Sequence, residues 1–219
     1  LVASVFAAAA TGSSWLDMCA GPGGKAALLS SIARKRGITF TANEVSPVRA
    51  DLVRQVVNGD RVLVGDGRVI GNREEKFDAI LIDAPCTGQM LVGRGKQSFA
   101  AFTESQIAHS AARQLRIVSA ASSLVRPGGR LVYSTCTFAP TENEDVIETF
   151  LATHEGWHVE HVAELQQWQS PRSPGGYRLY PHRDRCAGAY AVRLRLSGNR
   201  EPEQKSSRQK EMKDEPLVL

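Results

Sequence analysis

Short apolar runs alternate with longer helical patterns along the chain, and this alternation limits the possible folds more than any other feature. The apolar runs predict strands at 13–19, 38–44, 62–65, 77–83 and 130–136. The segments between and after them predict helices at 24–36, 46–58, 103–125 and 141–154. Repeated strand–helix units of this kind form a doubly wound, mostly parallel sheet with helices on both faces. The sequence therefore predicts an α/β, Rossmann-like fold.

Two further strands are predicted near the end of the chain, at 157–162 and 187–196. The second alternates apolar and polar residues in the way that a half-exposed antiparallel strand does. We therefore expect the last strand of the sheet to be antiparallel. No internal repeat is visible.

Turn and capping residues mark the predicted helix boundaries. Ser46 is expected to be an N-cap, with Pro47 at the first helical position. The capping boxes TESQ (103–106) and TENE (141–144) predict two more helix starts, and RPGG (126–129) predicts where the third helix stops. The buried face of that third helix is expected to be Ile107, Ala111, Leu115, Val118, Ser122 and Val125.

The length of 219 residues fits one domain, which we assign to 1–196. Residues 197–219 are mostly charged and have lost apolar periodicity, so we expect a disordered tail or a linker. The stretch LVASVFAAAA (1–10) lacks the basic start of a signal peptide and is too short to span a bilayer. We predict a helix packed beside the domain, and a monomer without a membrane segment. The first residue is Leu, which suggests that an upstream part is missing.

The four cysteines are too far apart for a zinc knuckle, and no metal site is predicted. Free thiols without signal-peptide features suggest a reducing compartment, the cytoplasm. Cys19 and Cys186 are assigned packing roles. Cys86 and Cys136 differ because each follows a predicted strand, and the carboxyl ends of parallel strands form the ligand-binding edge of such a sheet. Asp83 adds a carboxylate at the same edge.

A glycine turn, DMCAGPGGKAA (17–27), joins the first strand to the first helix. A Walker A loop is excluded because Cys19 and Ala26 stand where that motif needs glycine and a hydroxyl residue. A dinucleotide fingerprint fits formally, and so does the S-adenosylmethionine turn of a class I methyltransferase. The turn alone does not separate these two interpretations.

Two carboxylates at the ends of the next strands suggest a nucleotide-like ligand. Glu44 ends the second strand, where a carboxylate can accept both ribose hydroxyls. Asp66 follows the third strand in GDGR, where it could accept from an adenine amine. One ligand lying across the sheet edge explains these acids and the glycine turn together.

Two thiols near such a ligand suit one reaction in particular. The methyl group of S-adenosylmethionine is electrophilic, and carbon 5 of cytosine is too weak a nucleophile to accept it. A thiolate that adds to carbon 6 turns the ring into an enamine-like species whose carbon 5 can attack the methyl group. This chemistry requires a cysteine with a lowered pKa close to the donor, and an acid or base at the ring edge.

Several stretches, in order along the chain, resemble the motifs of the Fmu/Sun (RsmB/RsmF-type) RNA 5-methylcytosine methyltransferases. They are DMCAGPGGK, ANEVSPVRADLV, GDGR, DAPCTG, Gln114 with RPGGRLVYSTCTFAPTENEDVI, and RLYPHRDRCAGAYAV. The resemblance covers nearly all of 14–196, and the last stretch looks closest to the RsmF-type branch. The pair of motifs around Cys86 and Cys136 is highly specific to this family.

The resemblance implies a catalytic domain that uses S-adenosylmethionine to methylate RNA, most of all ribosomal RNA, with transfer RNA as the alternative substrate. It implies that Cys136 is the nucleophile, that Cys86 assists release of the methylated RNA, and that Asp83 contacts the cofactor and the cytosine edge. The implied cofactor-binding residues are Cys19, Ala20, Gly21, Pro22, Gly23, Gly24, Lys25, Glu44, Arg49, Asp66 and Asp83. Members also carry an RNA-binding segment upstream, which we expect to be absent from this chain.

The chain departs from the family pattern at three places. Thr87 follows the release cysteine where the family has serine, Gly21 stands where it commonly has alanine, and the loop QMLVGRGKQSF (89–99) diverges. Basic residues are candidates for phosphate contact, namely Arg94, Lys96, Arg178, His182 and Arg183. The alternative functions are a catalytically silent RNA-assembly module, a nicotinamide-dependent oxidoreductase, and a DNA cytosine methyltransferase, which would not need Cys136.

Overall fold

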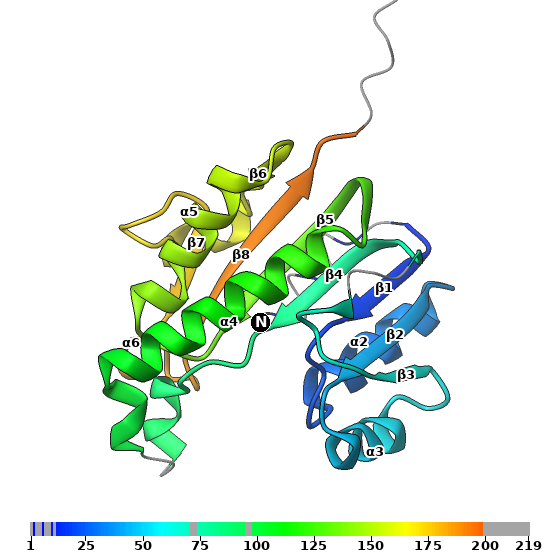
Figure 1. Cartoon of the computed structure of the whole chain (residues 1–219), viewed down its shortest axis with the longest axis horizontal. Helices are drawn as coiled ribbons and strands as arrows, with labels where there is room; N and C mark the ends of the chain where they lie inside the picture. Colours follow the sequence, from blue (N-terminus) through cyan, green and yellow to red (C-terminus); the bar gives the residue numbers. More distant parts are fainter. Residues whose placement is uncertain are drawn as a thin grey trace, which may run out of the picture.

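The computed structural model describes residues 12–70, 74–94 and 98–198, together with Val2, Phe6 and Ala10. A single mixed sheet forms its centre, with strands in the order β3-β2-β1-β4-β5-β8-β6, and β7 also pairs with β8 (Figure 1). The strands are β1 Ser14–Asp17, β2 Thr39–Glu44, β3 Arg61–Val64, β4 Phe77–Asp83, β5 Val125–Thr135, β6 Trp157–Val159, β7 Gly176–Leu179 and β8 Ala189–Leu196. The first five are parallel, and β8 runs antiparallel to β5. The predicted α/β architecture and antiparallel last strand are confirmed.

Helices cover both faces of the sheet. The α-helices are α2 Gly24–Lys35, α3 Pro47–Val56, α4 Glu104–Ser122, α5 Glu144–Thr153 and the short α6 Pro181–Asp184. The 3-10 segments are η2 Gln89–Arg94, η3 Phe99–Phe102, η4 Pro140–Glu142 and η5 Ala163–Trp168. Buried residues of α4 and α5 pack on one face, and those of α2 and α3 pack on the other.

The central strand β4 shows why the sheet needs both layers. Ile80 and Ile82 point into the cluster beneath α4 and α5, whereas Ala79 and Leu81 point into the cluster beneath α2. Because successive side chains of a strand point to opposite faces, a strand that is apolar throughout is stable only when both faces are covered. The continuous apolar run AILI (79–82) at the centre of this strand is therefore the sequence form of a doubly covered strand.

The ends of the chain lie largely outside the described residues. Of the predicted helix at 1–10, the structure describes Val2, Phe6 and Ala10, all three buried, with Phe6 packed edge-on against Trp15. The predicted tail from residue 199 onward is outside the description, and so are Lys96 and the side chain of Arg94. No helix in the described part of the chain is long and apolar enough to cross a membrane.

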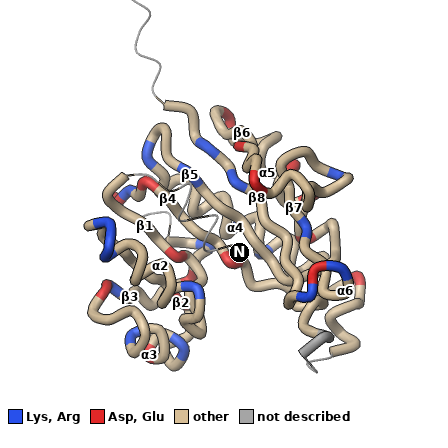
Figure 2. The backbone as a smooth tube through the Cα atoms, turned by 180° about the vertical axis from the view of Figure 1, so that it is seen from behind, with Lys and Arg blue, Asp and Glu red and all other residues tan. Residues whose placement is uncertain are grey.

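Charged residues do not form one basic element. Figure 2 shows Lys and Arg positions spread over both halves of the domain and interspersed with Asp and Glu. The net charge of +4 is therefore distributed along the chain.

One predicted helix start is confirmed, and two local predictions are wrong. Helix α4 begins at Glu104 with Thr103 as its N-cap, as predicted, although the Thr103 hydroxyl donates to Ala100 O instead of accepting from the helix. Helix α5 begins only at Glu144, after the 3-10 turn η4, so the start predicted at Thr141 is wrong. The RPGG segment belongs to β5, which begins at Val125, five residues before the predicted strand. There the pairing with β4 shifts register, and a side chain on Gly129 would lie 2.8 Å from the Asp78 carbonyl oxygen. The glycines therefore form a β-bulge within β5, whereas α4 has already ended at Ser122.

Other boundaries follow the sequence more closely. Ser46 caps α3 by accepting from Arg49 N, with Pro47 in the first turn, as predicted. On α4 the predicted Val118 and Ser122 are buried, but the buried face also includes Ser110, Gln114, Ile117 and Ala121. Strand β6 ends at Val159, three residues early, and β7 was not predicted.

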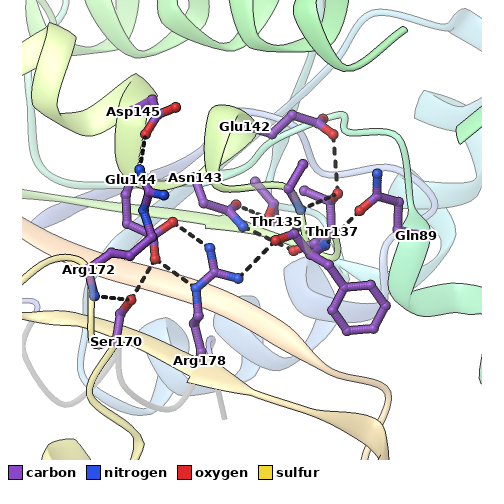
Figure 3. Close-up of polar contacts among 12 residues, drawn as sticks. Gln89, Thr135, Thr137, Glu142, Asn143, Glu144, Asp145, Ser170, Arg172 and Arg178 are labelled. Atoms are coloured by element: carbon purple, nitrogen blue, oxygen red, sulfur yellow. Dashed lines mark hydrogen bonds and ion pairs between the residues drawn. The ribbon is translucent and has the colours of Figure 1, made fainter. Parts of the chain in front are cut away.

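A buried ion pair fastens β7 to the start of α5. Figure 3 shows the Arg178 guanidinium pointing at the Glu144 carboxylate, and both side chains are almost wholly buried. Glu144 also accepts from Ser170 Oγ at 2.7 Å, and Arg178 donates to Phe138 O at 3.1 Å. The prediction that Arg178 contacts phosphate is therefore wrong, because its side chain is buried and engaged within the fold.

We expect Arg178→Met to lower the free energy of unfolding by about 3–5 kcal/mol, because it leaves the Glu144 carboxylate buried without a cation. Urea denaturation measures the change. The double variant Arg178→Met with Glu144→Leu should recover most of the loss, since neither charge is then left alone. An equal loss in both variants would show that the ion pair is not the cause.

Candidate active site

A cavity of about 570 Å³ lies at the carboxyl ends of the parallel strands, where β1 separates β2 from β4. This is the point at which ligands bind in doubly wound sheets. Seven of the predicted cofactor-binding residues line it: Cys19, Gly21, Pro22, Glu44, Arg49, Asp66 and Asp83. Four others lie beside it, namely the buried Ala20, then Gly23, Gly24 and Lys25 at the start of α2.

Glu44 connects the glycine turn to the second strand. Its Oε2 accepts from Gly21 N at 3.0 Å, and its Oε1 accepts from Ser46 N and from Arg49 Nε, both at 2.9 Å. A Cβ at position 21 would come within 2.3 Å of Glu44 Oε2, so a residue larger than glycine there would displace the Glu44 carboxylate from this position. A carboxylate has about four acceptor positions, which leaves Oε2 able to accept from a ligand hydroxyl.

Asp66 also lines the cavity and is paired with Arg68. The guanidinium donates to both carboxylate oxygens, and the Arg68 amide donates to Oδ1 at 2.9 Å. Hydrogen bonds from the Arg68 side chain and amide lower the pKa of Asp66 to about 2. Asp66 is therefore ionised at neutral pH, as an acceptor for an amine should be.

Several cavity residues were not predicted. Asn43 donates from Nδ2 to Met18 O and Gly65 O, both at 3.0 Å, and so ties the loops after β1 and β3 together. His109, Arg113 and Ile117 reach the cavity from α4. Their i, i+4, i+8 spacing places them on one helical face, and this spacing is visible in the sequence. The sequence does not show which way that face points, because this depends on how α4 packs.

Asp83 ends β4 and links the cavity to the thiols. Its Oδ2 lies 2.6 Å from Lys25 Nζ, and its Oδ1 accepts from Ser134 Oγ at 2.9 Å. Lys25, although outside the cavity lining, thus brings the glycine turn to the same carboxylate. This ion pair is only partly exposed.

The two strand-end thiols lie together. Cys86 Sγ is 3.3 Å from Cys136 Sγ, and Cys136 N donates to Cys86 Sγ at 3.4 Å. Both are half-buried and adjoin the cavity through Asp83 and Pro85 rather than lining it themselves. The prediction that one sheet edge brings them together is confirmed.

The environment makes the two thiols unequal. A hydrogen bond from the Cys86 thiol lowers the pKa of Cys136 against the effects of burial and of the Asp83 carboxylate, and the Lys25 ammonium lowers it further. The same hydrogen bond, together with burial, raises the pKa of Cys86. Cys136 therefore loses its proton first, with Cys86 as the donor to its thiolate.

The remaining cysteines differ from this pair. Burial raises the pKa of Cys19 well above its ordinary value, and the side chain packs against the core while also lining the cavity. Cys186 is exposed and accepts from Gly188 N. Within the described ranges, no group of three or more metal-ligating side chains could hold a metal ion.

Asp17 is a fully buried carboxyl group at the end of β1. Its Oδ1 accepts from Cys19 N at 3.3 Å, and no described residue donates to its Oδ2. Burial and the neighbouring Asp83 carboxylate raise the pKa of Asp17 to about 7.

This raised pKa predicts how stability depends on pH. An unfolded aspartate titrates near pH ~3.9, so the folded chain holds the Asp17 proton more tightly. The free energy of unfolding should therefore fall as pH rises from about 4 to 7, by about 1.4 kcal/mol per pH unit from this group, and then level off. Asp17→Asn removes this contribution. The free energy of unfolding of the variant, compared with that of wild type, should therefore increase as pH rises through the same range. Urea denaturation of both proteins measures it; a difference independent of pH would contradict the assignment.

The thiol geometry predicts a selective chemical reaction. Diamide should join Cys86 to Cys136, since their sulfurs are already in contact, with both thiol hydrogens passing to the reagent. Mass spectrometry of digested protein should find this one bridge, reversed by dithiothreitol. Bridges that involve Cys19 or Cys186 at equal yield would show that the pair is not close in solution.

Comparison with known proteins places the chain in a family. Residues 5–195 match the model of the 16S rRNA methyltransferase RsmB/F family. A Mycobacterium tuberculosis protein, provisionally named as a methyltransferase, is 36% identical over 188 residues, which are 83% of this chain and 40% of that protein. Ribosomal RNA small subunit methyltransferase F of Erwinia tasmaniensis is 32% identical over 82% of this chain and 39% of its own length. The chain thus spans about two fifths of these relatives.

A solved structure shows the same fold. NSun6 from Pyrococcus horikoshii has a TM-score of 0.76 and 25% identity, over 89% of this chain and 50% of its own. The predicted fold class, that of S-adenosylmethionine-dependent methyltransferases, is confirmed. With the family model matched from residue 5 to residue 195, the chain belongs to the RsmB/F family of 16S rRNA methyltransferases.

Proposed function

We propose that this chain is the catalytic domain of an enzyme that transfers a methyl group from S-adenosylmethionine to carbon 5 of a cytosine in RNA, through a covalent cysteine adduct. The observation that carries the proposal is the contact of Cys86 and Cys136, 3.3 Å apart, beside the Asp83 edge of the cavity. Relatives named for small-subunit ribosomal RNA support ribosomal RNA as the substrate. We expect the enzyme to act in the cytoplasm.

The cavity fits S-adenosylmethionine. Its walls carry the carboxylates of Glu44, Asp66 and Asp83, which suit the ribose hydroxyls, the adenine amine and the positively charged end of the cofactor. Asn43 Oδ1 is a buried acceptor to which no described residue donates, and it could accept from the ligand. NSun6 from Pyrococcus horikoshii was solved with SFG, an S-adenosylmethionine analogue.

When bound, S-adenosylmethionine supplies an electrophilic methyl group. Cys136, which ionises before Cys86, adds to carbon 6 of cytosine, and the ring electron pair moves to carbon 5, which takes the methyl group. The Lys25–Asp83 pair offers a donor and an acceptor for the cytosine edge, which carries N3 and the exocyclic amine. A base then removes the carbon 5 proton, and the carbon–sulfur bond breaks to return the Cys136 thiolate.

Cys86 is positioned for the release step. Its sulfur touches the sulfur that must leave the adduct, and its thiol can donate to that sulfur as negative charge returns to it. The target base must be unpaired or extruded to reach both thiols, at a cost of a few kcal/mol if it begins in a stack.

The two cysteines should give opposite phenotypes. We expect Cys136→Ala to abolish methyl transfer, because no thiolate attacks carbon 6. We expect Cys86→Ala to accumulate a covalent protein–RNA species, because addition proceeds and release does not. Radiolabelled methyl transfer and denaturing gels of protein–RNA mixtures measure these outcomes.

Other results would assign the site differently. Loss of the adduct in Cys86→Ala but not in Cys136→Ala would exchange the two roles. Unchanged modification in cells with Cys136→Ala would favour a silent RNA-assembly module. Bisulfite sequencing of RNA from a strain lacking the gene would locate the cytosine and distinguish ribosomal from transfer RNA.

A further inference from the structure

Glu142 is a buried carboxylate at the end of η4, and its two oxygens connect the loops that carry the two cysteines. Its Oε2 accepts from Thr87 N at 3.0 Å, and its Oε1 accepts from Thr87 Oγ1 at 2.5 Å and from Thr137 Oγ1 at 3.2 Å. Thr87 directly follows Cys86, and Thr137 directly follows Cys136. One side chain therefore holds the residues next to both thiols.

A third element is tied to the same carboxylate. Gln114 of α4 donates from Nε2 to Glu142 Oε2 at 2.9 Å and to Pro85 O at 3.0 Å. Pro85 precedes Cys86, so the Cys86 loop is fixed on both sides of the cysteine. Gln114 is itself fully buried. The loop after β4, the loop after β5 and α4 thus meet at Glu142.

We infer that Glu142 is a positioning residue that holds the Cys86 and Cys136 loops at the separation at which their sulfurs touch. The importance of this positioning role for catalysis rests on the proposed function. The separation itself can be measured without RNA.

The chemistry of the contacts requires a carboxylate. Every group directed at Glu142 from Thr87, Thr137 and Gln114 can donate, and an ionised carboxylate only accepts. An amide of the same shape would turn its NH₂ group toward one set of these donors. Glu142→Gln should therefore keep the volume of the side chain while losing about half of its acceptors.

Glu144 provides a matched control two residues along the chain. It is equally buried, but Figure 3 shows it directed at Arg178 and Ser170, away from Thr137, to which Glu142 is joined. Glu144→Gln thus removes a buried carboxylate without altering a contact to Thr87 or Thr137. Any effect of Glu142→Gln that is absent from Glu144→Gln reports on the thiol loops rather than on stability.

The test measures the thiol pair directly in the full chain. We expect the rate at which diamide joins Cys86 to Cys136 to fall about tenfold in Glu142→Ala, with a smaller fall in Glu142→Gln, because intramolecular reactions depend steeply on orientation. The pH midpoint for alkylation of Cys136 by iodoacetamide should rise in the same order, since the Cys86 hydrogen bond is weakened. Glu144→Gln should match wild type in both assays. Should Glu142→Ala fail to fold, Glu142→Gln carries the test.

Methyl transfer then separates this inference from the proposed function. Slow bridging and slow methyl transfer in Glu142→Gln, with normal RNA binding, support both. If the wild-type protein does not methylate RNA, the proposed function is refuted. Slow disulfide formation in Glu142→Gln would still support the positioning role. Two results for Glu142→Gln overturn the inference. One is a rate of disulfide formation and an alkylation midpoint equal to those of Glu144→Gln. The other is methyl transfer at the wild-type rate although disulfide formation is slow.

Discussion

The parallel pairing of β4 with β5 is the constraint on which the rest of the site depends. It places Asp83 opposite Ser134, and the pairing continues one step further, with Ala84 N donating to Ser134 O at 2.8 Å. The two strands consequently release their loops at the same level, and the cysteines on those loops meet. A slip of one residue would turn Asp83 to the other face of the sheet and separate it from the cavity. The site is thus a direct product of strand register.

Charge compensation distinguishes the acids at this edge of the sheet. Parallel strands that all end in acids bring like charges close together, which is unfavourable unless each charge has a partner. Basic residues supply partners in the pairs Glu44–Arg49, Asp66–Arg68 and Asp83–Lys25. Asp17 has no cation of its own among the described contacts, and its pKa rises to about 7 instead. The edge therefore combines three carboxylates that are paired with basic side chains and one buried carboxyl group whose pKa is raised.

The parts of the site that could be predicted are those that depend on where strands end. Cys86 and Cys136 follow strands whose apolar runs are plain in the sequence, so their meeting at one edge follows from the fold class. Residues whose role depends on packing could not be predicted. Arg178 looks like any surface arginine until β7 pairs with β8 and turns it toward Glu144. His109 carries no sequence sign that its face of α4 borders a cavity.

The capping box predicted at TENE (141–144) does not form for the same reason, namely that the roles of its acids depend on packing. Alone, such a segment would place Glu144 against the backbone amide at the start of the helix, an interaction worth about 1 kcal/mol. In the folded chain Glu144 instead accepts from Arg178 and Ser170, and Glu142 accepts from the thiol loops. Hydrogen bonds to a charged group contribute about 1.5–3 kcal/mol each, and a buried carboxylate left without them is strongly unfavourable. Long-range contacts therefore outweigh the local cap, and two acids from one short motif serve separate parts of the structure, one the β7 hairpin and the other the pair of thiols.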